Sequence, residues 1–156
     1  MSDVTDLSDR TRPRVIRRIR AGGGRWPMLA AISAGGMLGA VARDLLATAM
    51  PHTAAQFPWS TFVINVSGCL LIGALMVLLT EVWTGRRMLR PFLATGMLGG
   101  YTTFSTYVVD VQRGLAAPAP RTALAYLVAT PVCALLAVLA ATRITRRLIR
   151  PRHKKR

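Results

Sequence analysis

Four apolar blocks, each about 20 residues long, dominate this chain of 156 residues, and about 20 residues is the length that crosses a hydrocarbon core. The interiors of the blocks are almost free of charge, whereas a soluble four-helix bundle would need a charged face on every helix. The sequence therefore predicts an all-α membrane protein with four transmembrane helices. The predicted spans are residues 27–50, 60–83, 91–111 and 122–142.

The regions outside the spans are short. We expect a basic tail over residues 1–26, a four-helix transmembrane domain over residues 27–145 and a second basic tail over residues 146–156. The first tail combines acids with many arginines and lacks the apolar stretch of a cleavable signal peptide, so we expect it to be disordered. The tails and loops leave no room for a soluble domain.

The basic residues are distributed very unevenly along the chain. Of the 21 lysines and arginines, 18 lie before the first span, after the last span or between the second and third spans, and two lie in the connections on the other side. This bias predicts a multi-pass plasma-membrane protein with both termini in the cytoplasm. Anionic headgroups of the lipid bilayer account for the basic tails, so we expect no nucleic-acid partner.

Small and charged residues mark the first predicted span. Gly35 and Gly39 are four residues apart, a spacing that lets helix backbones approach closely. Arg43 follows near the end of the span, where a charge is costly unless it reaches the headgroups or pairs. Two interpretations remain open: an interfacial arginine paired with Asp44, or a fixed positive charge at the mouth of an anion pathway.

Polar residues also lie within the second and fourth predicted spans. Thr61 and Asn65 share one helix face, and an asparagine inside a span either bonds two helices together or donates to a dehydrated ligand. Tyr126 and Thr130 form a weak polar track in the fourth span, for which helix contact is the default interpretation. Pro131 comes next and frees a backbone carbonyl.

The segment GGYTTFSTY, residues 99–107, lies inside the third predicted span. Paired glycines weaken a helix, and non-helical backbone in a membrane is tolerated only within protein or along a pathway. We therefore expect the third helix to be broken at residues 99–106. The freed carbonyls are candidates to coordinate a cation, and the ring edge of Phe104 is electropositive enough to face an anion. A tightly packed contact between helices is the alternative interpretation.

Three motifs occur in a fixed order along the spans: GxxxGAxxR at residues 35–43, TFxxNxxG at residues 61–68 and GxxGGxTTFST at residues 96–106. Together with the length and the four spans, they closely resemble the CrcB/Fluc family of fluoride channels over about residues 28–142. The resemblance implies four-helix subunits that pair antiparallel into a dimer with two pores. It also implies a structural sodium ion (Na+) at the dimer centre, held by the backbone carbonyls of Gly99 and Thr102 from both subunits.

The resemblance also implies roles for side chains along the pore. Phe104 matches the first of two phenylalanines that contact fluoride, and Asn65 matches the pore asparagine. Tyr107 stands where the second phenylalanine is usual, which adds a hydroxyl to the ring. The remaining matches are Thr61 and Ser105 as polar neighbours, Arg43 as the vestibule arginine, and Tyr126 and Thr130 as a loosely matched polar track.

The charge bias has a consequence for pairing. An antiparallel homodimer needs a chain that inserts in both orientations, whereas a split of 18 to 2 should fix one orientation. We therefore favour a heterodimer with an oppositely oriented paralogue over a homodimer.

The predicted function is a passive, fluoride-selective channel that exports cytoplasmic fluoride. A small proton-coupled exporter is one alternative, but it needs a membrane-embedded carboxylate, and the acids near the spans, Asp44, Glu81 and Asp110, all lie near span ends. A membrane assembly subunit that conducts no ions is another. We expect no enzyme activity, because no nucleophile and base pair is recognisable, and no ATP site, because the GxxxxGK[ST] motif is missing.

Overall fold

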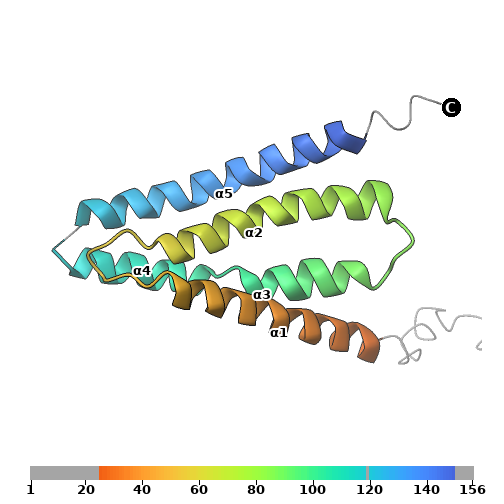
Figure 1. Cartoon of the computed structure of the whole chain (residues 1–156), viewed down its shortest axis with the longest axis horizontal. Helices are drawn as coiled ribbons and strands as arrows, with labels where there is room; N and C mark the ends of the chain where they lie inside the picture. Colours follow the sequence, from red (N-terminus) through yellow and green to blue (C-terminus); the bar gives the residue numbers. More distant parts are fainter. Residues whose placement is uncertain (1–24, 119, 150–156) are drawn as a thin grey trace, which may run out of the picture.

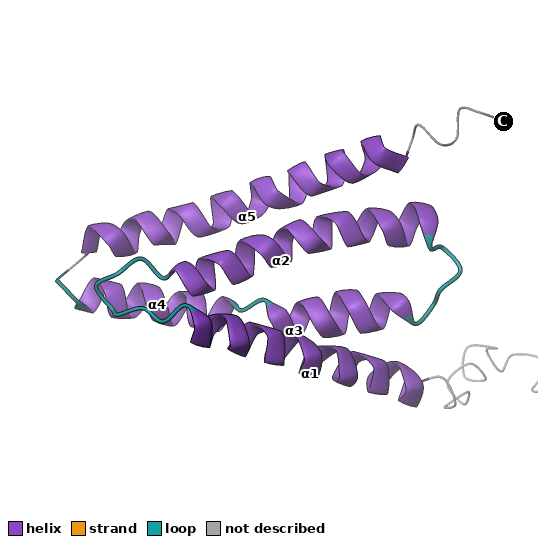
Figure 2. Ribbon diagram, viewed as in Figure 1, coloured by secondary structure: helices purple, strands orange, loops and turns teal. Residues whose placement is uncertain are grey.

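Every regular element in residues 25–118 and 120–149, which the computed structural model describes, is a helix (Figure 2). In chain order the elements are α1 (Arg25–Ala49), α2 (Trp59–Val77), the π-helices η3 (Leu78–Val82) and η4 (Arg90–Leu98), α3 (Gly99–Tyr101), α4 (Phe104–Ala116) and α5 (Pro120–Ile149).

The helices form four antiparallel rods (Figure 1). The first rod is α1, the second is α2 continued by η3, the third is η4, α3 and α4 in succession, and the fourth is α5. Three helices are long and apolar enough to cross a membrane, namely Arg25–Ala49, Trp59–Val82 and Pro120–Ile149. The third rod does not qualify by length because it is divided into shorter helices.

The described ends of the chain lie at one end of the molecule, together with the connection between η3 and η4 (Figure 1). Helix α5 continues to Ile149, past the expected domain end at residue 145. Arg146 in this extension donates from Nε to Oε1 of Glu81 at 3.1 Å. Such an exposed pair contributes at most about 1 kcal/mol, so good helix formers mainly explain the extension. Residues 1–24 and 150–156, most of the expected tails, lie outside the described residues.

Glycines bring the first and third rods into backbone contact. An added Cβ at Gly35 would collide with the carbonyl of Phe92, and one at Gly39 would collide with the carbonyl of Met97. Gly100 in the third rod is equally close to the backbone of α1. The predicted close approach at Gly35 and Gly39 is therefore confirmed. The third rod packs against α1 in the segment that precedes its two non-helical residues, Thr102 and Thr103.

The second and fourth rods pack against each other, and α4 packs against α5. The centre of this half is the fully buried ring of Tyr126, whose centroid lies 5.2 Å from that of Tyr107 and 5.3 Å from that of Phe57. Large apolar side chains elsewhere face outward, such as Leu45 and Leu135, which are 64% and 62% exposed. An apolar exterior of this kind suits a hydrocarbon solvent.

Candidate functional site

The third rod is interrupted at two threonines. Helix α3 ends at Tyr101 and α4 begins at Phe104, while Thr102 and Thr103 are extended, with φ and ψ of −78° and 157° and of −146° and 123°. The Oγ1 atom of Thr103 caps α4 by accepting from the backbone N–H of Thr106 at 3.2 Å. The interruption therefore has a defined geometry, with a capped helix N-terminus on one side.

Asn65 holds this interruption from the neighbouring rod. Its Oδ1 accepts from the backbone N–H of Thr103 at 2.9 Å, and its Nδ2 donates to the Thr103 carbonyl at 2.9 Å. The side chain thus satisfies both backbone groups of one extended residue. Because an amide nitrogen carries two hydrogens, one hydrogen of Nδ2 remains for a further acceptor. Asn65 therefore joins α2 to the non-helical backbone between α3 and α4.

The backbone carbonyls of Gly99 and Thr102 are among those that lose their helical donors at the interruption. In a continuous helix the N–H of Thr103 would donate to Gly99 and the N–H of Thr106 would donate to Thr102. These N–H groups instead donate to Asn65 and to the Thr103 side chain. No heavy atom lies within 4 Å of the position where a Cβ on Gly99 would stand, apart from its own helix and chain neighbours. The chain is therefore uncovered at Gly99, on the side where a Cβ would stand.

A groove of about 400 Å³ lies beside the interruption. Its walls are mostly apolar, and its polar residues include Asn65, Thr102 and Thr103. The ring centroids of Phe104 and Tyr107 are 5.7 Å apart on one wall. The groove is lined by Asn65, Gly68, Cys69, Ile72, Ala94, Leu98, Gly99, Thr102, Thr103, Phe104, Tyr107, Thr130, Pro131 and Ala134.

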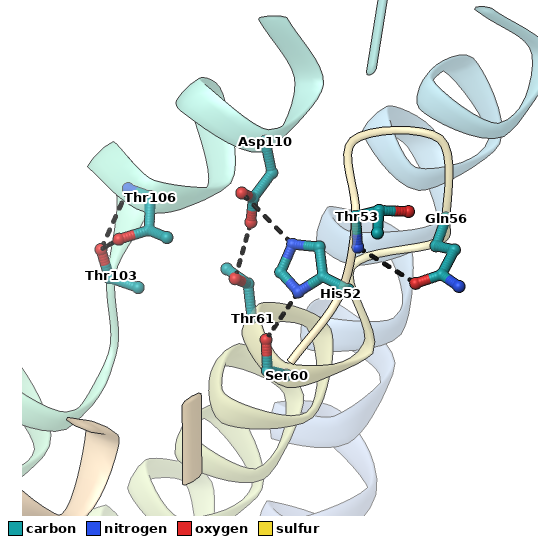
Figure 3. Close-up of polar contacts among 8 residues, drawn as sticks. All are labelled: His52, Thr53, Gln56, Ser60, Thr61, Thr103, Thr106 and Asp110. Carbon is teal, nitrogen blue, oxygen red and sulfur yellow. Dashed lines mark hydrogen bonds and ion pairs between the residues drawn. The ribbon is translucent and has the colours of Figure 1, made fainter. Parts of the chain in front are cut away.

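A buried carboxylate, that of Asp110, lies further along α4. The sequence showed this residue only as an acid near the end of a predicted span. Asp110 is 7% exposed and accepts from Oγ1 of Thr61 at 2.7 Å. His52, in the connection between α1 and α2, brings Nε2 to 3.5 Å from the other carboxylate oxygen, and its Nδ1 lies 3.3 Å from the Ser60 hydroxyl (Figure 3). Helical spacing was the available signal, because Tyr107 and Asp110 are three residues apart and share one face of α4.

The polar pair of α5 is buried without hydrogen-bond partners. Tyr126 and Thr130 are 0% and 4% exposed, and neither hydroxyl has a partner among the described residues. Thr130 lines the groove, whereas Tyr126 does not. A buried hydroxyl without a partner is unusual in a folded protein, so Thr130 is a candidate to bond a ligand or water in the groove.

Other predicted site residues lie away from the groove. Ser105 is exposed on the outer side of α4, where its hydroxyl lies 3.3 Å from that of Thr103. Thr61 directs its only hydroxyl hydrogen at Asp110. Arg43 is half-buried on α1, and within the described residues it forms no ion pair with Asp44. One chain therefore gathers Gly99, Thr102, Asn65, Phe104, Tyr107 and Thr130 around the groove, but not the other predicted residues.

The fold and this groove define the class of protein: a multi-pass helical membrane protein whose third rod is opened at a polar interruption. Residues 30–142 match the family described as CrcB-like protein, Camphor Resistance (CrcB). The chain belongs to the CrcB family.

Several relatives are similar over more than half of the chain. A protein of Streptomyces avermitilis named fluoride-specific ion channel FluC 2 is 51% identical over 114 residues, which cover 73% of this chain and 72% of the relative. A protein of Thermobifida fusca with the same name is 48% identical over 124 residues, covering 80% and 92%. Streptomyces avermitilis also has a protein named FluC 3, which is 46% identical over 86 residues, covering 55% and 42%.

Proposed function

We propose that this chain forms a passive, fluoride-selective channel with four membrane spans, through which cytoplasmic fluoride leaves the cell. The carrying observation is that a chain about half identical to proteins named fluoride-specific ion channels has a groove lined by Phe104, Tyr107 and Asn65 at the helix interruption. The activity belongs to a channel and not to an enzyme.

The driving force follows from the chemistry of fluoride. HF crosses a bilayer uncharged and dissociates in the more alkaline cytoplasm, where the anion is trapped. A membrane potential that is negative inside then drives the anion outward through a channel, by about 2.3 kcal/mol per elementary charge per 100 mV. No coupled energy source is required for this export.

Selectivity requires donors that replace the water of a small, strongly hydrated anion. The free hydrogen on Nδ2 of Asn65 and the electropositive ring edges of Phe104 and Tyr107 supply them along the groove. The unpaired hydroxyls of Tyr126 and Thr130 continue the polar path on α5. Thr61 plays a different part in this scheme, since its hydrogen orients the Asp110 carboxylate. We propose that the path formed by the assembled subunits is too narrow for the larger chloride ion.

A structural sodium ion fits the donors at the interruption. The carbonyls of Gly99 and Thr102 have lost their helical N–H donors, and hard cations prefer oxygen ligands. Two carbonyls from each of two subunits would hold the ion between them. Its positive charge would stabilise the contact between two chains and the anion path beside it.

We also propose that two chains pair antiparallel across the interruption. Phe104 is 77% exposed in the single chain although it lines the groove, and the Gly99 face is open, so a second subunit would cover both. The basic residues still favour a heterodimer over a homodimer, and the FluC 2 and FluC 3 proteins of Streptomyces avermitilis show that one organism can hold two such relatives. Self-pairs alone, with termini found on both sides of the membrane, would contradict the heterodimer.

The alternatives make different demands on the groove. A proton-coupled exporter needs a carboxylate that contacts the cargo, and no acidic residue in the described part of the chain lines this groove. Asp110 is buried, but it is engaged with Thr61 and His52. An assembly subunit predicts that changes to Phe104 have no effect on fluoride resistance.

Growth of a fluoride-sensitive bacterium that lacks its own fluoride exporters tests the proposal. We expect expression of the chain, alone or with an oppositely oriented paralogue, to restore growth on fluoride. Phe104→Ile should abolish the rescue, whereas Leu135→Ile on the outward face of α5 should leave it intact. Equal rescue by Phe104→Ile and the unchanged chain would favour the assembly subunit.

A further inference from the structure

Helix α5 contains a carbonyl that its own backbone does not satisfy. Pro131 lies inside α5 and has no N–H, so the carbonyl of Leu127, four residues earlier, has no helical donor. Inside a membrane, water is not at hand to replace that donor. A transmembrane helix with an internal proline therefore needs a partner from elsewhere in the protein.

The partner comes from the residue at which this chain departs from the usual phenylalanine. The hydroxyl of Tyr107 donates to the Leu127 carbonyl at 2.7 Å, across the contact between α4 and α5. Tyr107 is only 8% exposed, so this bond is protected from solvent. The Tyr107 hydroxyl thus supplies the hydrogen bond that Pro131 cannot donate to the Leu127 carbonyl.

The bond also decides which part of Tyr107 faces the groove. A phenol has one hydrogen to donate, and that hydrogen is directed at Leu127 and not into the groove. The ring is held between Phe104 and Tyr126, with centroid distances of 5.7 and 5.2 Å. The groove is therefore offered a ring, as a phenylalanine would offer it.

We propose that Tyr107 is a positioning residue whose hydroxyl replaces the N–H missing at Pro131 and thereby fixes its ring on the wall of the ion path. The hydroxyl is not a fluoride ligand. The part of the inference that concerns ion flow rests on the proposed channel function. The pairing of Tyr107 with the Leu127 carbonyl stands independently of it.

A double-mutant cycle on the purified protein tests the pairing. Tyr107→Phe leaves the Leu127 carbonyl buried without a donor and should raise the unfolding equilibrium constant about tenfold. In a Pro131→Ala background the alanine N–H takes over the carbonyl, so adding Tyr107→Phe should have little effect. Tyr101→Phe is the matched control: its hydroxyl lies 2.8 Å from Ser67, so its effect should be the same in both backgrounds. Equal effects of Tyr107→Phe in both backgrounds would overturn the pairing.

The Leu127 carbonyl can be observed directly by NMR. Leu127 and Val128 form the only Leu–Val pair in the chain, so labelling with carbonyl-¹³C leucine and ¹⁵N valine selects this one peptide bond. Loss of a hydrogen bond should shift the carbonyl resonance upfield in Tyr107→Phe and leave it unchanged in Tyr101→Phe. An unchanged resonance in Tyr107→Phe would also overturn the pairing.

Fluoride efflux separates a positioning role from a ligand role. If the hydroxyl only positions the ring, efflux falls in Tyr107→Phe and is largely restored in the double variant with Pro131→Ala. Equal loss in the single and double variants would show that the hydroxyl contacts the ion, and it would overturn the positioning role. An unmutated protein that passes no fluoride would contradict the channel function alone, because the unfolding and NMR results do not depend on fluoride.

Discussion

Replacing Asn65 with leucine should destabilise the protein far more than the loss of one exposed polar group. The change keeps the approximate side-chain volume but removes both hydrogen bonds to Thr103, each 2.9 Å long. Thr103 is 8% exposed, so its N–H and its carbonyl would remain buried without partners. At about 1–3 kcal/mol for each such group, the expected loss in the free energy of unfolding is about 2–6 kcal/mol.

Reversible unfolding in detergent or bilayer discs measures this loss. Ser67→Ala is the matched control on the same helix, because it removes one hydroxyl that contacts Tyr101 and the Ile64 carbonyl, and its expected loss is about 1 kcal/mol. If Asn65→Leu were no more destabilising than Ser67→Ala, the side chain would not be holding the interrupted backbone, and the reasoning about the interruption would be wrong.

Three further perturbations probe separate parts of the structure. Gly39→Ala should lower the free energy of unfolding by about 1–3 kcal/mol through overpacking against the third rod, while Gly85→Ala, in open space, should not change it. Thr61→Val should cost about 1.5–3 kcal/mol, because it removes a hydrogen bond to the buried Asp110 carboxylate, whereas the same change at the exposed Thr80 should have little effect on unfolding. Exhaustive replacement of sodium by a large organic cation should weaken dimers or fluoride flux. Unchanged dimerisation, measured by cross-linking, together with unchanged flux would contradict the proposed sodium site.

The helical class and the close approach at Gly35 and Gly39 could be read from the sequence, because both depend on local pattern and spacing. The partners of the polar residues could not, because they come from distant parts of the chain. Asn65 bonds a backbone 38 residues away and Thr61 a carboxylate 49 residues away. Periodicity assigns each residue to a helix face, but it does not say which group that face meets.

Asp110 is a second residue whose partners could not be predicted from the sequence. The sequence placed it near the end of an apolar segment and named no partner for it, yet the connection between α1 and α2 brings His52 to its buried carboxylate. Tyr107 is a third case. The freed carbonyl at Pro131 was predictable from the sequence alone, but the hydroxyl that occupies it belongs to another helix.

Fluoride efflux from liposomes tests the central claim most directly. The purified chain is reconstituted alone or with an oppositely oriented paralogue, and release of fluoride and of chloride is followed with ion-selective electrodes. The account predicts rapid fluoride efflux, little chloride efflux and loss of fluoride efflux in Phe104→Ile. Absence of fluoride efflux in both reconstitutions, or equal passage of fluoride and chloride, would contradict it.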